Sequence, residues 1–75
     1  MRQAEPRFSA YAADDGRAHA VPEAGSFAEA ALLFSEVWRP AEAADELRVV
    51  VVDRETGERQ CYCVDLGAGA AAPCG

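Results

Sequence analysis

The clearest hydrophobic pattern in the chain has the helical period of about 3.6 residues and starts at Phe27. Ser26 and Glu29 have the spacing of a capping box, in which each side chain accepts a hydrogen bond from the amide of the other residue. Pro40 disfavours helical geometry at the residue before it. These features predict a helix over residues 27–38, and Leu32 falls outside the apolar stripe formed by Phe27, Ala30, Ala31, Phe34, Val37 and Trp38.

A predicted hairpin precedes this helix. Two short, semi-apolar runs at 8–13 and 18–21 flank the turn sequence Asp-Asp-Gly-Arg at 14–17. Glycine accepts the positive φ that tight hairpin turns require, so this arrangement favours two antiparallel strands.

A second predicted hairpin follows the helix. β-branched residues predict a strand over 47–53, and residues 60–66 form the returning strand. With Gly57 as the third residue of a three-residue loop, the register places Val50 opposite Tyr62. The sequence therefore predicts an α+β domain of order β-β-α-β-β, in which an antiparallel sheet carries one helix packed on a face.

The chain of 75 residues has the length of a single domain. We assign that domain to residues 7–66. Residues 1–6 are polar and are expected to form a flexible N-terminus. Residues 67–75 are rich in Ala and Gly, contain Pro73 and are expected to form a flexible tail.

The predicted register gives the second hairpin two apolar faces. One face carries Leu47, Val49, Val51, Cys61 and Cys63, and the other carries Val50, Val52, Tyr62, Val64 and Leu66. A single helix covers one face, so the other needs a cover from the N-terminal segment, the tail or a second copy of the chain. We predict a homodimer, or an unidentified protein partner, at this second face.

The residues of that interface depend on which face the helix covers. We favour the helix on the Tyr62 face, because Tyr62 offers bulk beside Phe34 and Trp38. The predicted interface is then Val49, Val51, Cys61 and Cys63, with Leu32 from the helix. With the helix on the cysteine face, the interface would instead be Val50, Val52, Tyr62 and Val64.

The net charge of −6 argues against nucleic-acid and anionic-membrane partners, because like charges repel. All seven basic residues are Arg, and they are scattered along the sequence. The chain has no apolar stretch near the roughly 20 residues of a membrane span and no apolar signal-peptide region, so we expect a cytoplasmic protein. The bias toward Ala and Arg is typical of a GC-rich bacterial genome.

Candidate chemistry is limited to the cysteines and one histidine. Cys61 and Cys63 share a face of the predicted strand, but their side chains stand about 7 Å apart, which suits neither a shared metal ion nor a disulfide. We interpret them as small buried hydrophobes and Cys74 as an exposed thiol in the tail. His19 is predicted at the surface or a sheet edge. We predict no catalytic residues and no cofactor.

Several segments of the helix and of the second hairpin carry a resemblance to a known family: Ser26-Phe-Ala-Glu-Ala-Ala31, Phe34, Trp38, Val51-Val-Asp53, Gly57 and 61–66. They resemble a small uncharacterised family of alphaproteobacterial proteins. The resemblance covers roughly residues 7–66 and implies no assigned activity. The architecture of a hairpin followed by a helix is also similar to the small domains of HicB-type antitoxins, although we expect no DNA-binding extension of the kind that such antitoxins often carry.

The sequence therefore predicts a non-enzymatic protein-interaction domain that associates with itself through the second apolar face of the 47–66 hairpin. The alternative is a thiol-based metal-binding or redox module that uses Cys61, Cys63 and Cys74. Metal content and response to a chelator discriminate between the two.

Overall fold

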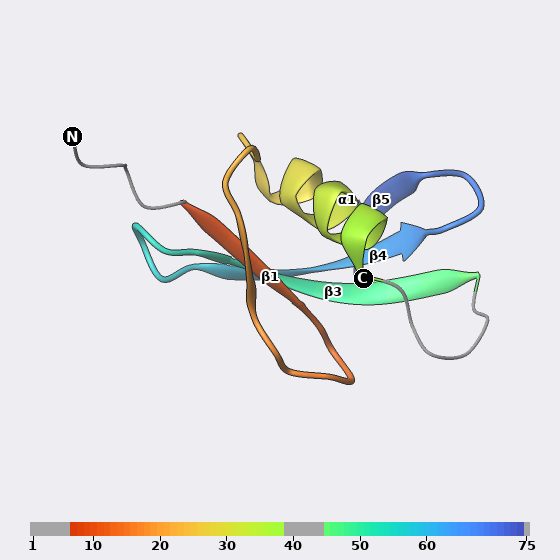
Figure 1. Cartoon of the computed structure of the whole chain (residues 1–75), viewed down its shortest axis with the longest axis horizontal. Coiled ribbons are helices and arrows are strands. Elements are labelled where there is room, and N and C mark those ends of the chain that lie inside the picture. Colours follow the sequence, from red (N-terminus) through yellow and green to blue (C-terminus); the bar gives the residue numbers. More distant parts are fainter. Residues whose placement is uncertain (1–6, 39–44, 75) are drawn as a thin grey trace.

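The computed structural model describes residues 7–38 and 45–74. Within these residues, five antiparallel strands form one sheet, and one helix packs on a face of it (Figure 1). The elements are β1 (Phe8–Ala12), β2 (His19–Val21), α1 (Phe27–Val37), β3 (Glu46–Asp53), β4 (Arg59–Asp65) and β5 (Ala70–Pro73). The predicted α+β class and the helix on one face are confirmed. The predicted flexible segment 1–6 lies outside the described residues.

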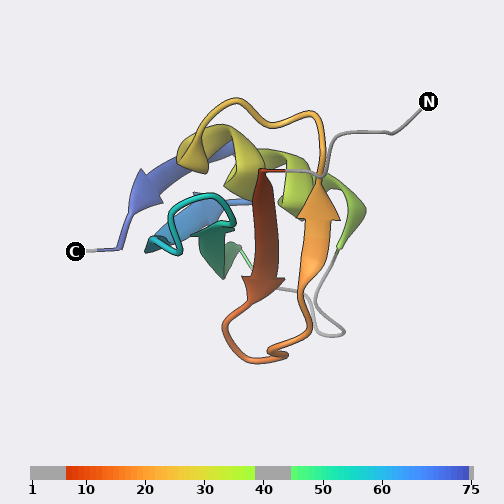
Figure 2. The same cartoon turned by 90° about the vertical axis from the view of Figure 1, so that its left-hand side faces the viewer.

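The strands are arranged in the order β2-β1-β3-β4-β5. Figure 2 shows β1 and β2 running in opposite directions with α1 on one side of the sheet. β3 is the central strand and pairs with β1 on one side and β4 on the other. β5 was not predicted: part of the expected flexible tail instead forms this edge strand, which pairs with β4.

Helix α1 begins at the predicted cap. The Glu29 amide donates to the Ser26 hydroxyl at 3.1 Å, as the capping box requires. The Glu29 carboxylate, however, accepts from the Gly25 amide at 2.5 Å rather than from that of Ser26. The reciprocal half of the box is therefore shifted by one residue.

The buried side of α1 is rotated slightly from the predicted stripe. Ala30, Ala31 and Phe34 are buried as expected. Val37 is 82% exposed, whereas Ser35 is buried and its hydroxyl donates to the Leu32 carbonyl at 2.7 Å. The prediction was wrong for Val37, because the helix turns its Ser35 edge toward the sheet instead.

The hydrophobic core fills the space between α1 and one face of the sheet. Apolar side chains at alternate positions of three strands point into it, as expected for strands with one covered face. The fully buried large side chains include Phe8, Phe34, Val49, Val51 and Val64. Phe34 from the helix stacks on Trp38 with ring centroids 5.8 Å apart, and it lies 5.6 Å from the ring of His19 on β2.

The register of the second hairpin differs from the prediction by one residue. Val49 rather than Val50 lies opposite Tyr62, and Val50 lies opposite Cys61. The loop between the strands has four residues rather than three, because the Asp53 amide donates to the Glu58 carbonyl at 2.8 Å. A slip of one residue changes which side chains of the two strands share a face. The two predicted faces were therefore wrongly composed.

The β3–β4 turn is fixed by the carboxylate of Asp53, a residue that is only 2% exposed. One of its oxygens accepts from the Glu55 amide at 2.9 Å. The other accepts from the Arg7 guanidinium at 2.9 and 3.2 Å. The hydrogen bond from Arg7 is the main cause that lowers the pKa of Asp53, so this carboxylate is charged at neutral pH.

Candidate functional site

The face of the sheet turned away from α1 is called the open face here, because no described element covers it. Its residues alternate along each strand with those of the core. They are Ser9, Tyr11, Ala20, Glu46, Arg48, Val50, Val52, Arg59, Cys61, Cys63, Asp65, Ala70, Ala72 and Cys74. All three cysteines of the chain therefore lie on one surface.

The three thiols form a single contact cluster on the open face. The Cys74 Sγ lies 2.8 Å from the Cys61 Sγ and 2.8 Å from the Cys63 Sγ. All three residues are half-buried and are free cysteines. The sulfur separations are longer than the roughly 2.05 Å of a disulfide bond, so the cluster is a set of reduced thiols in direct contact.

The strand β5 brings Cys74 to this position. The Cys74 amide donates to the Cys61 carbonyl at 2.9 Å, which extends the β4–β5 ladder past Pro73. Pro73 lies opposite Tyr62, at a position whose nitrogen faces away from β4, so its missing N–H costs no ladder hydrogen bond. A proline that was expected to mark a flexible tail is therefore compatible with the edge strand.

The alternative function predicted from the sequence names these three cysteines together, but their spacing does not predict that their side chains meet. Cys61 and Cys63 are two positions apart on β4 and do not need to approach each other. Cys74 contacts both of them from the neighbouring strand. The expectation that Cys61 and Cys63 are small buried hydrophobes is wrong, since both are half-buried on the open face.

The cluster has a cationic neighbour on β3. Arg48 lies directly opposite Cys63 in the register of β3 and β4. A hydrogen bond with Cys63 is the main cause that raises the pKa of Arg48. The Arg48 side chain is exposed, so its charge also faces approaching solutes.

The pKa values of Cys63 and Cys74 are both raised above that of an ordinary thiol. The pKa of Cys63 is raised chiefly by its hydrogen bond with Cys74, while Arg48 acts in the opposite direction and Glu46 adds to the increase. Desolvation is the main cause that raises the pKa of Cys74, followed by its hydrogen bond with Cys61. Both thiols are consequently protonated at neutral pH in the reduced cluster.

The described residues contain no group of three or more His, Cys, Asp or Glu side chains that could hold a metal ion.

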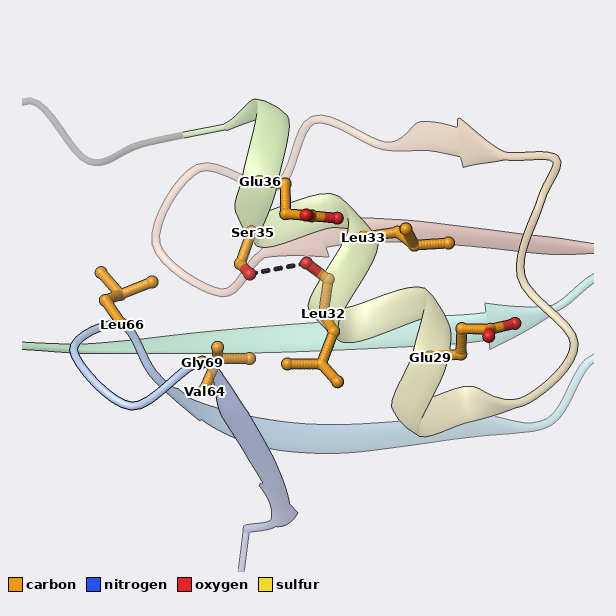
Figure 3. Close-up of a pocket in the computed structure, with 8 residues that line it drawn as sticks. All are labelled: Glu29, Leu32, Leu33, Ser35, Glu36, Val64, Leu66 and Gly69. Atoms are coloured by element: carbon orange, nitrogen blue, oxygen red, sulfur yellow. Dashed lines mark hydrogen bonds between the residues drawn. The ribbon is translucent and has the colours of Figure 1, made fainter.

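A groove of about 380 Å³ lies on the other side of the sheet, between α1 and the turn from β4 to β5. Figure 3 shows Leu32 pointing from the helix toward Val64 and Gly69. Leu66 and the two helix carboxylates, Glu29 and Glu36, also line it. The position of Leu32 outside the apolar stripe is thus explained by contact with the β4–β5 turn.

The predicted interface residues are separated by the observed register. Val49 and Val51 are completely buried against α1, so they offer no surface to a partner. Cys61 and Cys63 lie on the open face, and Leu32 lies in the groove on the opposite side of the sheet. His19 is exposed on the edge strand β2, as predicted.

A model for a family of unknown function, DUF5961, matches residues 6–75. The chain belongs to this family. The match confirms the resemblance to a small uncharacterised family and extends it through β5 and Cys74, whereas the similarity to HicB-type antitoxins stays a prediction. The curated proteins include no match to the chain. The solved structures include none either.

A membrane-spanning helix is not found in the described ranges, 7–38 and 45–74.

Proposed function

We propose that this family member is a non-enzymatic, thiol-based redox module in which Cys74 forms a disulfide with a cysteine of β4 under oxidising conditions. The contact of the Cys74 Sγ with both β4 sulfurs at 2.8 Å carries the proposal. Bond formation needs a sulfur movement of less than 1 Å to reach the length of about 2.05 Å. A reducing compartment such as the cytoplasm would hold the cluster in its thiol form until an oxidant appears.

The oxidant that we assign is a low-molecular-weight disulfide of the glutathione disulfide class. One protein thiolate attacks this disulfide, forms a mixed disulfide and releases one glutathione. A second protein thiolate then displaces the second glutathione. The two protein thiols together lose two hydrogens, and the oxidant is reduced to two molecules of glutathione.

Oxidation would tie an edge strand to its neighbour. Cys61 and Cys74 are 13 positions apart, and closing a loop of about 15 residues stabilises a protein by about 3 kcal/mol in the chain-entropy estimate. The bond would also hold β5 against β4 at the open face. The redox state would therefore change both the stability of the domain and the surface it presents.

Oxidation of dilute protein with one equivalent of glutathione disulfide is expected to give a monomer that is lighter by two hydrogens. Its free energy of unfolding should rise by about 2–3 kcal/mol. Intact-mass spectrometry after an acid quench measures the first effect, and urea denaturation measures the second.

Two matched variants identify the essential thiol. Cys63→Ser should still form the bond, because Cys61 and Cys74 remain. Cys74→Ser should keep its full hydrogen count under the same conditions. Equal oxidation of Cys74→Ser and the unmodified chain would contradict the proposal, because Cys61 and Cys63 would then be sufficient.

Self-association through the open face is the second candidate function. It is supported by the apolar side chains of Val50 and Val52, which are half-buried on a face that no described element covers. The observed register moves the proposed interface from Val49 and Val51 to these two residues. The expectation that nucleic acids are not partners stays a prediction from the net charge.

Sedimentation with reductant present tests this second candidate. The unmodified chain should sediment as a dimer and the double variant Val50→Asp/Val52→Asp as a folded monomer, because the added carboxylates would repel each other across the interface. Val37→Asp is the matched control, since Val37 is 82% exposed on α1 and should leave the dimer intact. A monomeric unmodified chain at high concentration would rule this function out.

A further inference from the structure

Cys74 could form a disulfide with Cys61 or with Cys63, and the two sulfur distances are equal. The backbone pairing of β4 and β5 distinguishes between these two bonds. Cys74 donates its amide hydrogen to the Cys61 carbonyl, so these residues form a hydrogen-bonded pair across β4 and β5. The Cα atoms of such a pair lie about 5.5 Å apart. This separation is inside the range of about 4.4–6.8 Å that disulfides span.

Cys63 is a diagonal neighbour of Cys74 instead. Its direct partner on β5 is Ala72. Diagonal neighbours on one face of a sheet lie about 7–8 Å apart, which is too far for a disulfide unless the backbone moves. The favoured bond therefore joins Cys61 to Cys74 and leaves Cys63 as a free thiol.

The surroundings of Cys63 change when that bond forms. In the reduced cluster, its hydrogen bond with Cys74 is the main cause that raises the pKa of Cys63. A sulfur in a disulfide has no proton to donate and carries no negative charge, so this cause is removed. Arg48 remains opposite Cys63 and stabilises its thiolate, while desolvation and Glu46 on the same face still oppose ionisation.

Resting on the function proposed above, we infer that Cys63 is a separate modification site, which takes a mixed disulfide with glutathione once Cys61 and Cys74 are joined. The Cys63 thiolate attacks glutathione disulfide, its S–S bond breaks, and a new bond forms between the Cys63 Sγ and one glutathione sulfur. The other glutathione leaves as a thiolate and takes up a proton. Arg48 is the positioning residue, because its exposed guanidinium can also bind a glutathione carboxylate.

Peptide mapping can locate the modified cysteine, because protease cleavage sites separate the three cysteines in the sequence. Chymotrypsin cuts after Tyr62 and Leu66, which places the three cysteines on three different peptides. With free thiols alkylated before digestion, the protein treated with excess glutathione disulfide should yield a peptide pair linked through Cys61 and Cys74, and glutathione on the peptide that contains Cys63. Cys63→Ser should form the same intramolecular disulfide and take no glutathione.

The role of Arg48 has its own readout. Arg48→Gln should slow glutathione addition to the oxidised chain by more than about twofold, because the cation that lowers the pKa of Cys63 and favours its thiolate is lost. Arg59→Gln is the matched control, because Arg59 is four positions from Cys63 on the same strand, about 13 Å away. A rate within twofold of the unmodified chain for Arg48→Gln would overturn the positioning role.

The outcomes separate the two proposals. Glutathione on Cys61 or Cys74, or a bond between Cys63 and Cys74, would overturn the assignment of Cys63 and leave the redox function standing. The absence of any intramolecular disulfide would overturn the redox function itself, and the assignment of Cys63 with it.

Discussion

Replacing Val51 by Asp is expected to unfold the domain, whereas replacing Val50 by Asp should leave it folded. The two residues are adjacent on β3, but Val51 is completely buried under α1 and Val50 lies on the open face. Burial of an unpaired carboxylate costs several kcal/mol, which is a large part of the total stability of a chain this small. Far-UV circular dichroism and thermal unfolding measure the difference.

This pair of variants tests the assignment of faces directly. Both substitutions add the same charge to the same strand, so an effect of strand propensity alone would be similar in the two proteins. A folded Val51→Asp variant, or an unfolded Val50→Asp variant, would show that β3 turns its other face toward the helix.

Replacing Phe34 by Ala is expected to cost about 3–5 kcal/mol, the range for truncating a buried aromatic residue. Phe34 is 1% exposed, stacks on Trp38 and contacts His19 of β2. Its loss would leave a cavity between the helix and the sheet. Urea denaturation of the reduced protein is the appropriate measurement.

The same helix offers the control for this substitution. Val37 lies one turn from Phe34 and is 82% exposed, so Val37→Ala should change the free energy of unfolding by no more than about 0.5 kcal/mol. A loss below about 1 kcal/mol for Phe34→Ala would mean that α1 does not pack on the sheet through this ring.

Local signals predicted the helix and first hairpin well. The Ser26 cap and the period of the apolar residues located α1 to within one residue, because both act within a few positions of the chain. The register of the second hairpin was harder to predict, since it depends on the side chain of Asp53 and its partner Arg7. That contact joins residues 46 positions apart.

A signal for β5 was nevertheless present in the sequence. Among the described residues, three hairpin turns end in a glycine whose amide donates to the carbonyl four residues earlier, and each glycine has positive φ. The turns are Ala12–Gly16, Asp53–Gly57 and Asp65–Gly69. The second and third turns also each begin with an aspartate, Asp53 or Asp65, whose side chain accepts hydrogen bonds from amides of the turn. The match between them indicates a third hairpin, and thus a strand after Gly69.

The thiol cluster follows from that strand. The sequence shows three cysteines but not the pairing that brings Cys74 to β4, because the pairing depends on a strand composed mostly of alanine, a residue that is uncommon in strands. Once the turn at Gly69 is recognised, counting along the ladder places Cys74 opposite Cys61. The contact between the cysteines could therefore be predicted from the turn at Gly69, but not from the spacing of the cysteines in the sequence.

Nuclear Overhauser spectroscopy of the reduced protein tests the central claim, the contact of Cys74 with both β4 thiols, most directly. We expect cross-peaks from the Cys74 β-protons to those of Cys61 and Cys63, and slow exchange of the Cys74 amide hydrogen that bonds to the Cys61 carbonyl. Random-coil chemical shifts over residues 70–74, with no cross-peaks between these cysteines, would contradict the account.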